Sequence, residues 1–189
     1  MAEQPSLTTE RLILRPFTAD DAPAVEGMVG EREIALNTLM IPHPYPPGAA
    51  AEWIAKQPQR YANGEESTFA ITRRKEGDLV GAVGLIIRTE HDKGEFGYWI
   101  GKQFWGRGYA TEATAAVIRY GFEELSLNRI FAVHFSRNPS SGRVMLKNGM
   151  RHEGTLRQDL KKWGEYVDME AYGILRSEWA GGTKLKIEN

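Results

Sequence analysis

Apolar residues alternate with other residues near the N-terminus, where Leu12 and Leu14 occupy every second position within segment 11–17. This period of two predicts a half-buried strand, which Pro16 ends because proline has no N–H to donate to a sheet. After Thr18 the apolar positions recur at three and four residues, which predicts a helix. An acidic residue three positions after Thr18 completes a capping-box pattern at the start of that helix.

Prolines interrupt the pattern in segment 41–47, where four of them exclude regular helix and predict an extended loop. A second helix follows at near-helical apolar spacing and ends at about 63–64, where Asn-Gly suits a helix end. Three strand-like runs come next, and the short polar turns between them suit antiparallel hairpins. These runs are 67–74, 78–90 and 95–101.

The following segment alternates between helical and strand patterns. A helix over about 109–125 is followed by a strand over 129–135. Asn138 is the expected N-cap of the next helix, because Pro139 stands at its first position. Gly149 is expected to end that helix.

A final hairpin over roughly 152–160 and 165–175 completes an element order of β-α-α-β-β-β-α-β-α-β-β. This order predicts an α/β fold class in the layered α+β sense, with a mixed sheet of about seven strands flanked by about four helices. The length of 189 residues corresponds to a single domain over 1–189.

Composition excludes several classes of protein. The formal net charge is −1, which argues against a protein that coats a nucleic-acid backbone, since such binding draws on a basic excess. We therefore expect no direct nucleic-acid partner. No run approaches the roughly 18 consecutive apolar residues of a membrane span, and the N-terminal segment lacks the apolar stretch of a signal peptide. A cytoplasmic protein with no membrane partner is expected.

Several catalytic classes are excluded as well. The chain has no cysteine, which rules out disulfides, thiolate metal sites and a covalent mechanism through a cysteine nucleophile. The four histidines form no pair at metal-binding spacing, so neither a zinc hydrolase nor any metal is expected. The sequence also has no Gly-x-Ser-x-Gly elbow and no Walker-type phosphate loop.

Segment 97–113 carries the strongest chemical signal. A predicted strand ends just before a short loop with Gly106 and Gly108, and the loop leads directly into the next helix. Glycines let the backbone approach a ligand closely, and a helix N-terminus supplies unpaired N–H groups, so the loop suits a phosphate or pyrophosphate. Lys102 and Arg107 add positive charge at the same end. A tight strand-to-helix turn explains the glycines equally well, and both interpretations are open at this point.

The spacing around these glycines is that of a known motif. Gln103-x-x-Gly106-x-Gly108, followed by Tyr-Ala-Thr-Glu-Ala, resembles the acetyl-CoA pyrophosphate motif of the GCN5-related N-acetyltransferase (GNAT) superfamily. Segments 94–100 before it and 138–149 after it are similar to the RimJ/RimL-like branch of that superfamily. Members of this branch acetylate protein N-termini, notably those of ribosomal proteins, and some relatives acetylate other amines.

The resemblance covers a core of about 7–179 and implies an acetyltransferase domain with a GNAT fold, in which two central parallel strands splay apart. The strand that ends at Ile100 would separate from its neighbour at 129–135, and acetyl-CoA would lie in the slot as the co-substrate. A backbone N–H near Ile100 would polarise the thioester carbonyl. The cofactor contacts that the resemblance implies come from Trp99, Ile100, Gln103, Trp105, Gly106, Arg107, Gly108, Tyr109, Ala110, Thr111, Asn138, Ser141 and Lys147.

Some residues near the slot have simpler explanations. Capping alone explains Asn138, and Lys147 can be an ordinary exposed helix lysine. Tyr98 and Trp99 either line the slot or serve as alternating aromatic residues of a strand. Gly142 lies inside a predicted helix, where it costs about 1 kcal/mol relative to alanine, and close approach of a cofactor is one explanation.

Glu95 and Ser141 are the expected catalytic residues. The resemblance places a glutamate of this strand near the incoming amine, so Glu95 is the expected general base, with a solvated hairpin-end glutamate as the alternative. Ser141 matches the position proposed to protonate or hydrogen-bond the departing CoA thiolate, with a capping hydroxyl as the alternative. Glu112 is expected to stabilise the helix N-terminus or to orient a loop.

The acceptor is the least determined part of the prediction. The loop 41–47 and the hairpin tip 161–166 flank the place where an amine should approach, and Glu165 and Asp168 could attract it. The function expected first is direct acetyl transfer, in a ternary complex, to a protein N-terminal amine. The alternatives are a small amine such as a polyamine or amino sugar, a non-catalytic acyl-CoA-binding module, and an RNA-associated protein. A homodimer is a further expectation from the family.

Overall fold

A computed structural model describes residues 3–181 and 186–188; residues 1–2, 182–185 and 189 belong to the expected span 1–189 but lie outside the described part. The strands are β1 (Ser6–Thr8), β2 (Leu12–Arg15), β3 (Glu66–Arg73), β4 (Leu79–Arg88), β5 (Lys93–Ile100), β6 (Arg129–Phe135), β7 (Arg151–Lys162), β8 (Glu165–Leu175) and β9 (Lys186–Glu188). The α-helices are α1 (Ala22–Val29), α2 (Arg32–Leu36), α3 (Ala49–Ala62), α4 (Tyr109–Glu123) and α5 (Pro139–Lys147).

In the described part of the chain, the strands form one sheet of nine strands in the order β7-β8-β6-β5-β4-β3-β2-β1-β9. Every neighbouring pair in this order is antiparallel except β5 and β6, which run parallel. The predicted mixed, mostly antiparallel sheet is therefore confirmed. Parallel neighbours need a long crossover connection, and α4 supplies it between β5 and β6.

The predicted element order is confirmed, but the estimate of seven strands and four helices was too low, because β1, β9 and α2 were missed. Each is only three to five residues long, too short to show a period.

The strand expected over 11–17 is the second arm of a hairpin with β1. Thr9 closes this hairpin: its hydroxyl accepts the Leu12 N–H at 3.0 Å, and its own N–H donates to the Leu12 carbonyl at 2.9 Å.

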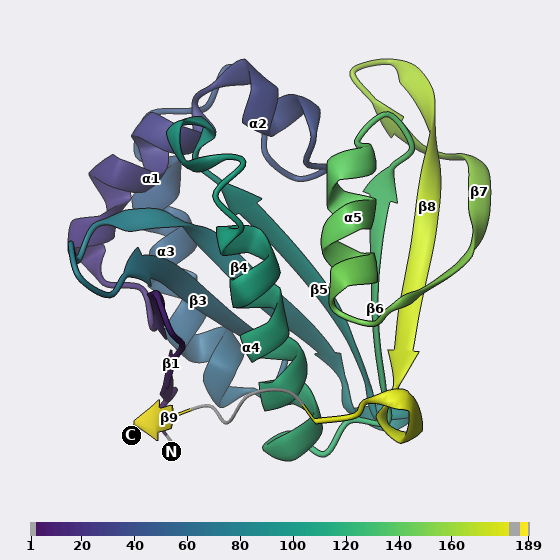
Figure 1. Cartoon of the computed structure of the whole chain (residues 1–189). Helices are drawn as coiled ribbons and strands as arrows, with labels where there is room; N and C mark the ends of the chain where they lie inside the picture. Colours follow the sequence, from purple (N-terminus) through teal and green to yellow (C-terminus); the bar gives the residue numbers. More distant parts are fainter. Residues whose placement is uncertain (1–2, 182–185, 189) are drawn as a thin grey trace.

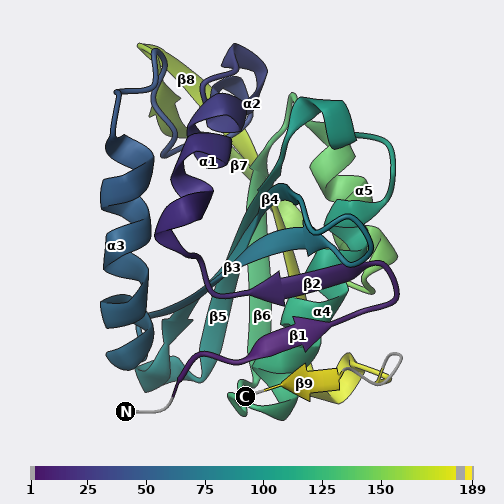
Figure 2. The same cartoon turned by 90° about the vertical axis from the view of Figure 1, so that its left-hand side faces the viewer.

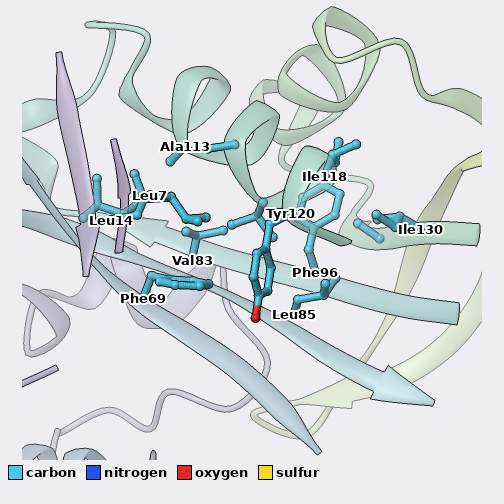
Figure 3. Packing of buried hydrophobic residues seen from close by; sticks show 14 of the residues in the cluster. Leu7, Leu14, Phe69, Val83, Leu85, Phe96, Ala113, Ile118, Tyr120 and Ile130 are labelled. Atoms are coloured by element: carbon cyan, nitrogen blue, oxygen red, sulfur yellow. The ribbon is translucent and has the colours of Figure 1, made fainter. Parts of the chain in front are cut away.

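Helices cover both faces of the sheet, with α1 and α3 on one face and α4 and α5 on the other (Figure 2). Under α4, the ring of Tyr120 meets Phe69 of β3 edge to face, with centroids 5.6 Å apart (Figure 3). Leu12 and Leu14 are fully buried, as their alternation predicts. Burying one such side chain stabilises the fold by about 1.5–3 kcal/mol. No helix in the described part of the chain is long and apolar enough to cross a membrane.

The parallel strands β5 and β6 pair over only three residues. Lys93, Gly94 and Glu95 pair with 129–131, and the pairing then stops although both strands continue. Beyond this point β5 stays paired with β4, and β6 stays paired with β8. Figure 1 shows the two strands meeting at one end and separating toward the end where α2 and α5 lie. The splayed strands expected from the resemblance are present.

Candidate active site

A cavity of about 380 Å³ lies where β5 and β6 separate. It is bounded by the end of β5, the loop that leads into α4, the first turn of α4, one side of α5 and the C-terminal end of α2. The residues that line it are Ile34, Asn37, Thr38, Tyr98, Trp99, Ile100, Phe104, Trp105, Gly106, Gly108, Tyr109, Ala110, Thr111, Asn138, Ser140, Ser141, Arg143, Val144 and Lys147.

The loop before α4 presents a row of free backbone N–H groups. Gly106 and Gly108 both adopt left-handed backbone angles, with φ of 75° and 81°, which other residues rarely adopt. Within the described residues, the N–H groups of 106–111 have no protein acceptor. Successive free N–H groups at a left-handed turn and a helix N-terminus form a site for an anion. The loop is thus both a tight turn and a suitable phosphate cradle, so the two interpretations of the glycines are compatible.

Glu112 holds this loop in place through Arg11. Its carboxylate accepts hydrogen bonds from the Thr9 hydroxyl at 2.6 Å and from the backbone N–H and Nε of Arg11 at 2.8 and 2.7 Å. Arg11 also donates from Nη1 to the carbonyl of Arg107 at 2.9 Å. Burial opposes ionisation of Glu112, but these hydrogen bonds outweigh it and keep the pKa of Glu112 below its usual value. The geometry agrees with a loop-orienting role for Glu112.

Ser141 is the centre of a polar network in the cavity. Its Oγ accepts hydrogen bonds from the Tyr98 hydroxyl at 3.0 Å and from Nδ2 of Asn138 at 3.1 Å. A hydroxyl oxygen has two acceptor positions, so both are used and the hydroxyl hydrogen is left to donate. Burial raises the pKa of Tyr98, so Tyr98 keeps its proton at neutral pH.

The side chain of Asn138 does not cap α5, contrary to the prediction. Asn138 does stand at the N-cap position, but it makes no side-chain capping hydrogen bond. Its backbone carbonyl already accepts the N–H of Ser141 at 3.1 Å, which satisfies one of the free donors of the first turn. The side-chain amide is therefore available to bind the Ser141 hydroxyl instead.

The end of β5 directs main-chain groups into the opening between the strands. Gly101 donates to the Val80 carbonyl at 2.9 Å, so the alternation of an antiparallel ladder turns the N–H and C=O groups of Tyr98 and Ile100 away from β4. The indole Nε1 of Trp105 occupies one of these groups, the Ile100 carbonyl, at 2.6 Å. The Ile100 N–H faces the same opening, at the position expected for an oxyanion contact.

All the expected cofactor residues line the cavity except Gln103 and Arg107. Gln103 is exposed in the single 3-10 turn Lys102–Phe104, and the Arg107 guanidinium lies over the ring of Phe104, 5.9 Å from its centroid. The expected charge of Lys102 is also engaged elsewhere, in an ion pair with Glu33 at 2.5 Å. Positive charge at the cavity comes from other residues.

Arg143 and Lys147 are the cations among the lining residues, and no acidic side chain lines the cavity. They lie four positions apart on α5 and so share one face of the helix. Arg143 was missed because an arginine on an exposed helix face has no distinctive signal. Helical spacing from Lys147 was the one signal in the sequence that could have identified it.

Glu95 does not line the cavity. It lies in the short stretch where β5 still pairs with β6, opposite Ile86 on β4. Its side chain is half-buried and has no hydrogen-bond partner among the described residues. Burial raises the pKa of Glu95, although the positive charges of Arg88 and Lys93 oppose the shift.

The two segments expected to flank the acceptor touch each other. Lys162, at the tip of the β7–β8 hairpin, donates from Nζ to the carbonyls of Leu39 and Ile41, both at 3.0 Å. Glu165 is exposed at the same tip. Asp168 is engaged within the hairpin, where it accepts the N–H of Gln158 at 2.7 Å.

Gly142 is explained by helix packing rather than by a cofactor. A Cβ atom at this position of α5 would lie 2.9 Å from Nε2 of His134 and 2.9 Å from the hydroxyl oxygen of Tyr172. These two side chains stand on β6 and β8 beneath the helix, with their rings stacked at a centroid distance of 5.5 Å. The glycine lets α5 lie close to the sheet.

Comparison with known proteins identifies the family. A family profile described as an acetyltransferase (GNAT) domain matches residues 11–151. The chain belongs to the GNAT acetyltransferase family. Its relatives include the "Uncharacterized N-acetyltransferase YoaA" of Bacillus subtilis, which is 33% identical over 173 residues that cover 91% of this chain and 97% of YoaA.

Two further matches show the range of the similarity. The "Putative ribosomal N-acetyltransferase YdaF" of Bacillus subtilis is 37% identical over 107 residues, 56% of this acetyltransferase and 58% of YdaF. The crystal structure of an acetyltransferase (GNAT family) from Bacillus anthracis superposes with a TM-score of 0.82 at 28% identity, covering 92% of this chain and 99% of that one. The expected GNAT membership and fold are confirmed. The protein is an acetyl-CoA-dependent N-acetyltransferase.

Proposed function

We propose that this acetyltransferase transfers the acetyl group directly to a primary amine in a ternary complex, and that the amine is a protein N-terminus. The observation that carries the proposal is the Ser141 hydroxyl, which two donors hold in the cavity and whose own hydrogen is left to donate. Acetyl-CoA supplies an activated acetyl thioester. An acetyl-cysteine enzyme is excluded because the chain has no cysteine, which favours direct transfer.

The cavity offers suitable partners for both ends of acetyl-CoA. The free N–H groups of 106–111, together with Arg143 and Lys147, suit its phosphates. The main-chain groups of Tyr98 and Ile100 that point away from β4 suit the amides of the pantetheine arm, which would pair with them as an added strand does. The side chain of Ser141 lines the same cavity.

Ser141 is assigned to the departing sulfur. A neutral serine is a weak acid, so its contribution is a hydrogen bond to the developing thiolate, which is stronger than a hydrogen bond between neutral groups. Tyr98 and Asn138 orient the hydroxyl by occupying its two acceptor positions. The pKa of Tyr98, raised mainly by burial, keeps this donor protonated through the reaction.

Glu95 is assigned as the proton acceptor on the other face of the sheet. An amine arrives protonated at neutral pH, so a group must take a proton before or during attack. By strand alternation Glu95 shares the face of Trp99, which packs against the α1–α3 side. We infer that the acceptor approaches from that side and that a chain of water molecules relays its proton to Glu95, because Glu95 lies five residues along β5 from Ile100, about 16 Å at strand spacing. The pKa of Glu95, raised mainly by burial, makes it a better base than an exposed glutamate.

The charges near the acceptor side are of both signs. Arg32, Arg137 and Lys162 lie beside the segment between α2 and α3, but the Glu26 carboxylate accepts the N–H of Gly48 in that segment and Glu165 is exposed at the hairpin tip. Charge alone therefore gives no preference between a single amine and a polyamine. The name of YdaF supports a protein N-terminus, while a small amine such as a polyamine or an amino sugar is the alternative.

The test is a CoA-release assay with three groups of acceptors: peptides with free N-termini, polyamines and amino sugars. We expect release with the peptides and mass-spectrometric acetylation of their α-amine. Release with spermidine or an amino sugar alone would overturn the proposed acceptor. Tight CoA binding without release across all three groups would instead identify a non-catalytic acyl-CoA-binding module.

A further inference from the structure

The chain after α2 is held by side chains rather than by a helix or a sheet. We call residues 36–41 the wall segment, because two of them, Asn37 and Thr38, line the cavity. A helix of five residues leaves its last carbonyls without intrahelical partners. Nδ2 of Asn37 donates to the Glu33 carbonyl and Oγ1 of Thr38 to the Ile34 carbonyl, both at 2.9 Å.

The other side chains that donate hydrogen bonds to the wall segment come from the part of the chain after β6. Arg137, on the connection between β6 and α5, donates from Nη2 to the Leu36 carbonyl at 2.8 Å. Lys162 donates to the carbonyls of Leu39 and Ile41, both at 3.0 Å. Figure 1 shows α2 and the tip of the β7–β8 hairpin at the same end of the molecule. The shape of the wall segment therefore depends on residues more than 100 positions away in the sequence.

A lysine is unusual at the position of Lys162, because the side chain is buried. Its side chain is only 6% exposed, and it forms no ion pair with a carboxylate among the described residues. Its Nζ lies 5.1 Å from the ring centroid of Trp163, but a buried cation without a counter-charge is still costly, and an apolar residue of similar size would fill the same space at lower cost. The residue gains two carbonyl partners in the segment that follows α2.

We propose that Lys162 is a positioning residue, which fixes the wall segment in the shape that receives the acceptor and so couples the β7–β8 hairpin to the cavity. The inference rests on the proposed function in one respect, that the acceptor approaches beside this segment. Arg137 fixes the near end of the segment and Lys162 the far end. The loop that suits the CoA phosphates lies elsewhere, at 106–111, and makes no contact with either cation in the hydrogen bonds described.

The first test needs no acceptor. Lys162→Met removes both hydrogen bonds and keeps the length of the side chain, while Lys162→Arg keeps a charged donor. Lys161→Met is the matched control, because Lys161 is exposed and lies over the ring of Tyr166. Hydrogen exchange of Ala35 and Asn37, whose N–H groups are hydrogen-bonded at the end of α2, should become about tenfold faster or more in Lys162→Met, and stay close to wild type in Lys162→Arg and Lys161→Met. Unchanged exchange in Lys162→Met would overturn the proposal.

The second test separates positioning from general stability. In Lys162→Met we expect the KM for a hexapeptide with a free N-terminal amine to rise about fivefold or more, with recovery in Lys162→Arg. The Kd for CoA, measured by calorimetry, should stay within about twofold of wild type. A Kd for CoA that rises in parallel with the KM would show a general structural defect and overturn the proposal. If no variant and no wild type uses the hexapeptide, the proposed acceptor fails, and the exchange experiment still decides the role of Lys162.

Discussion

Glu95 and Tyr98 stand three positions apart on β5 and face opposite sides of the sheet. Tyr98 packs toward α4 and donates its hydroxyl to Ser141, whereas Glu95 shares the face of Trp99. The register of β5 against β4 is continuous, so no bulge brings the two side chains to one face. Under the proposed mechanism, the proton leaves the amine on one side of the sheet and the sulfur receives its hydrogen bond on the other.

This separation predicts the behaviour of Glu95→Gln. The change removes the basic carboxylate and keeps its shape, so kcat should fall about 10²–10⁴-fold if proton removal limits the rate, while the Kd for acetyl-CoA stays near wild type. Because burial raises the pKa of Glu95, the wild-type rate should fall as the pH drops through that raised value. This acid limb should be absent in the variant. The fall in kcat caused by Glu95→Gln should also be smaller at high pH, because more of the amine is already neutral when it binds.

The control is Glu90→Gln, which changes an exposed glutamate in the turn between β4 and β5. It should leave both the rate and its pH profile unchanged. Wild-type turnover by Glu95→Gln at pH 7, with chemistry shown to limit the rate, would place the base elsewhere.

Ser141 and Tyr98 should act as one unit. Ser141→Ala removes a hydrogen bond to a charged sulfur and should lower kcat about 10- to 100-fold. Tyr98→Phe removes only one of the two donors that orient the hydroxyl, so a loss of up to about tenfold is expected. In the Ser141→Ala background Tyr98→Phe should have almost no further effect, since the group that it orients is gone. An undiminished effect of Tyr98→Phe in that background would mean that the tyrosine itself contacts the reacting atoms.

Gly108→Glu should weaken acetyl-CoA binding by about 100-fold or more, because it adds bulk and a negative charge to the phosphate cradle. The position has a φ of 81°, so any side chain also strains the turn, and its Cβ would lie 3.3 Å from Nη2 of Arg11. Gly77→Glu is the matched control, since Gly77 has a φ of 78° in the turn between β3 and β4 and open space around it. Calorimetric titration with acetyl-CoA should separate the two variants. Equal affinity in a folded Gly108→Glu protein would remove the basis for the phosphate assignment.

Gly142→Ala tests the packing of α5 on the sheet. Alanine is the better helix former by about 1 kcal/mol, but overpacking a well-packed site costs about 1–3 kcal/mol. The new Cβ would lie 2.9 Å from both His134 and Tyr172, so we expect the steric cost to exceed the gain and the free energy of unfolding to fall. Gly27→Ala in α1 is the control, because its Cβ would meet nothing within 4 Å, and it should stabilise the protein. Urea unfolding of both variants should show a lower free energy of unfolding for Gly142→Ala and a higher one for Gly27→Ala.

The sequence predicted those elements whose apolar period runs over several turns or several strand residues. Leu12 and Leu14 marked β2 by simple alternation, and the spacing of buried residues marked α4. The short elements β1 and α2 carry no such period, and they form because distant residues supply their partners. The hairpin is tied to α4 by the hydrogen bond between Thr9 and Glu112.

Only those parts of the site that depend on local sequence could be predicted. The glycine spacing and the helix that follows it are local features, so the loop at Gly106 and Gly108 could be predicted. The network around Ser141 joins β5 to α5, and nothing in the local sequence indicates that Asn138 binds this hydroxyl instead of capping its helix. The role of Gly142 could not be predicted either, because its neighbours stand on strands that the helix crosses only in the folded protein.

The early end of the β5–β6 pairing has a consequence for how the protein avoids unwanted association. A strand whose N–H and C=O groups lack a partner is a template on which other chains can add, and proteins usually charge or shorten such edges at their surface. Here an unpaired stretch of β5 lies in the middle of the sheet, beside a helix on one side and the wall segment on the other. Trp105 already covers the last carbonyl. The acetyltransferase thus keeps a strand edge available to a slender ligand while denying it to another polypeptide.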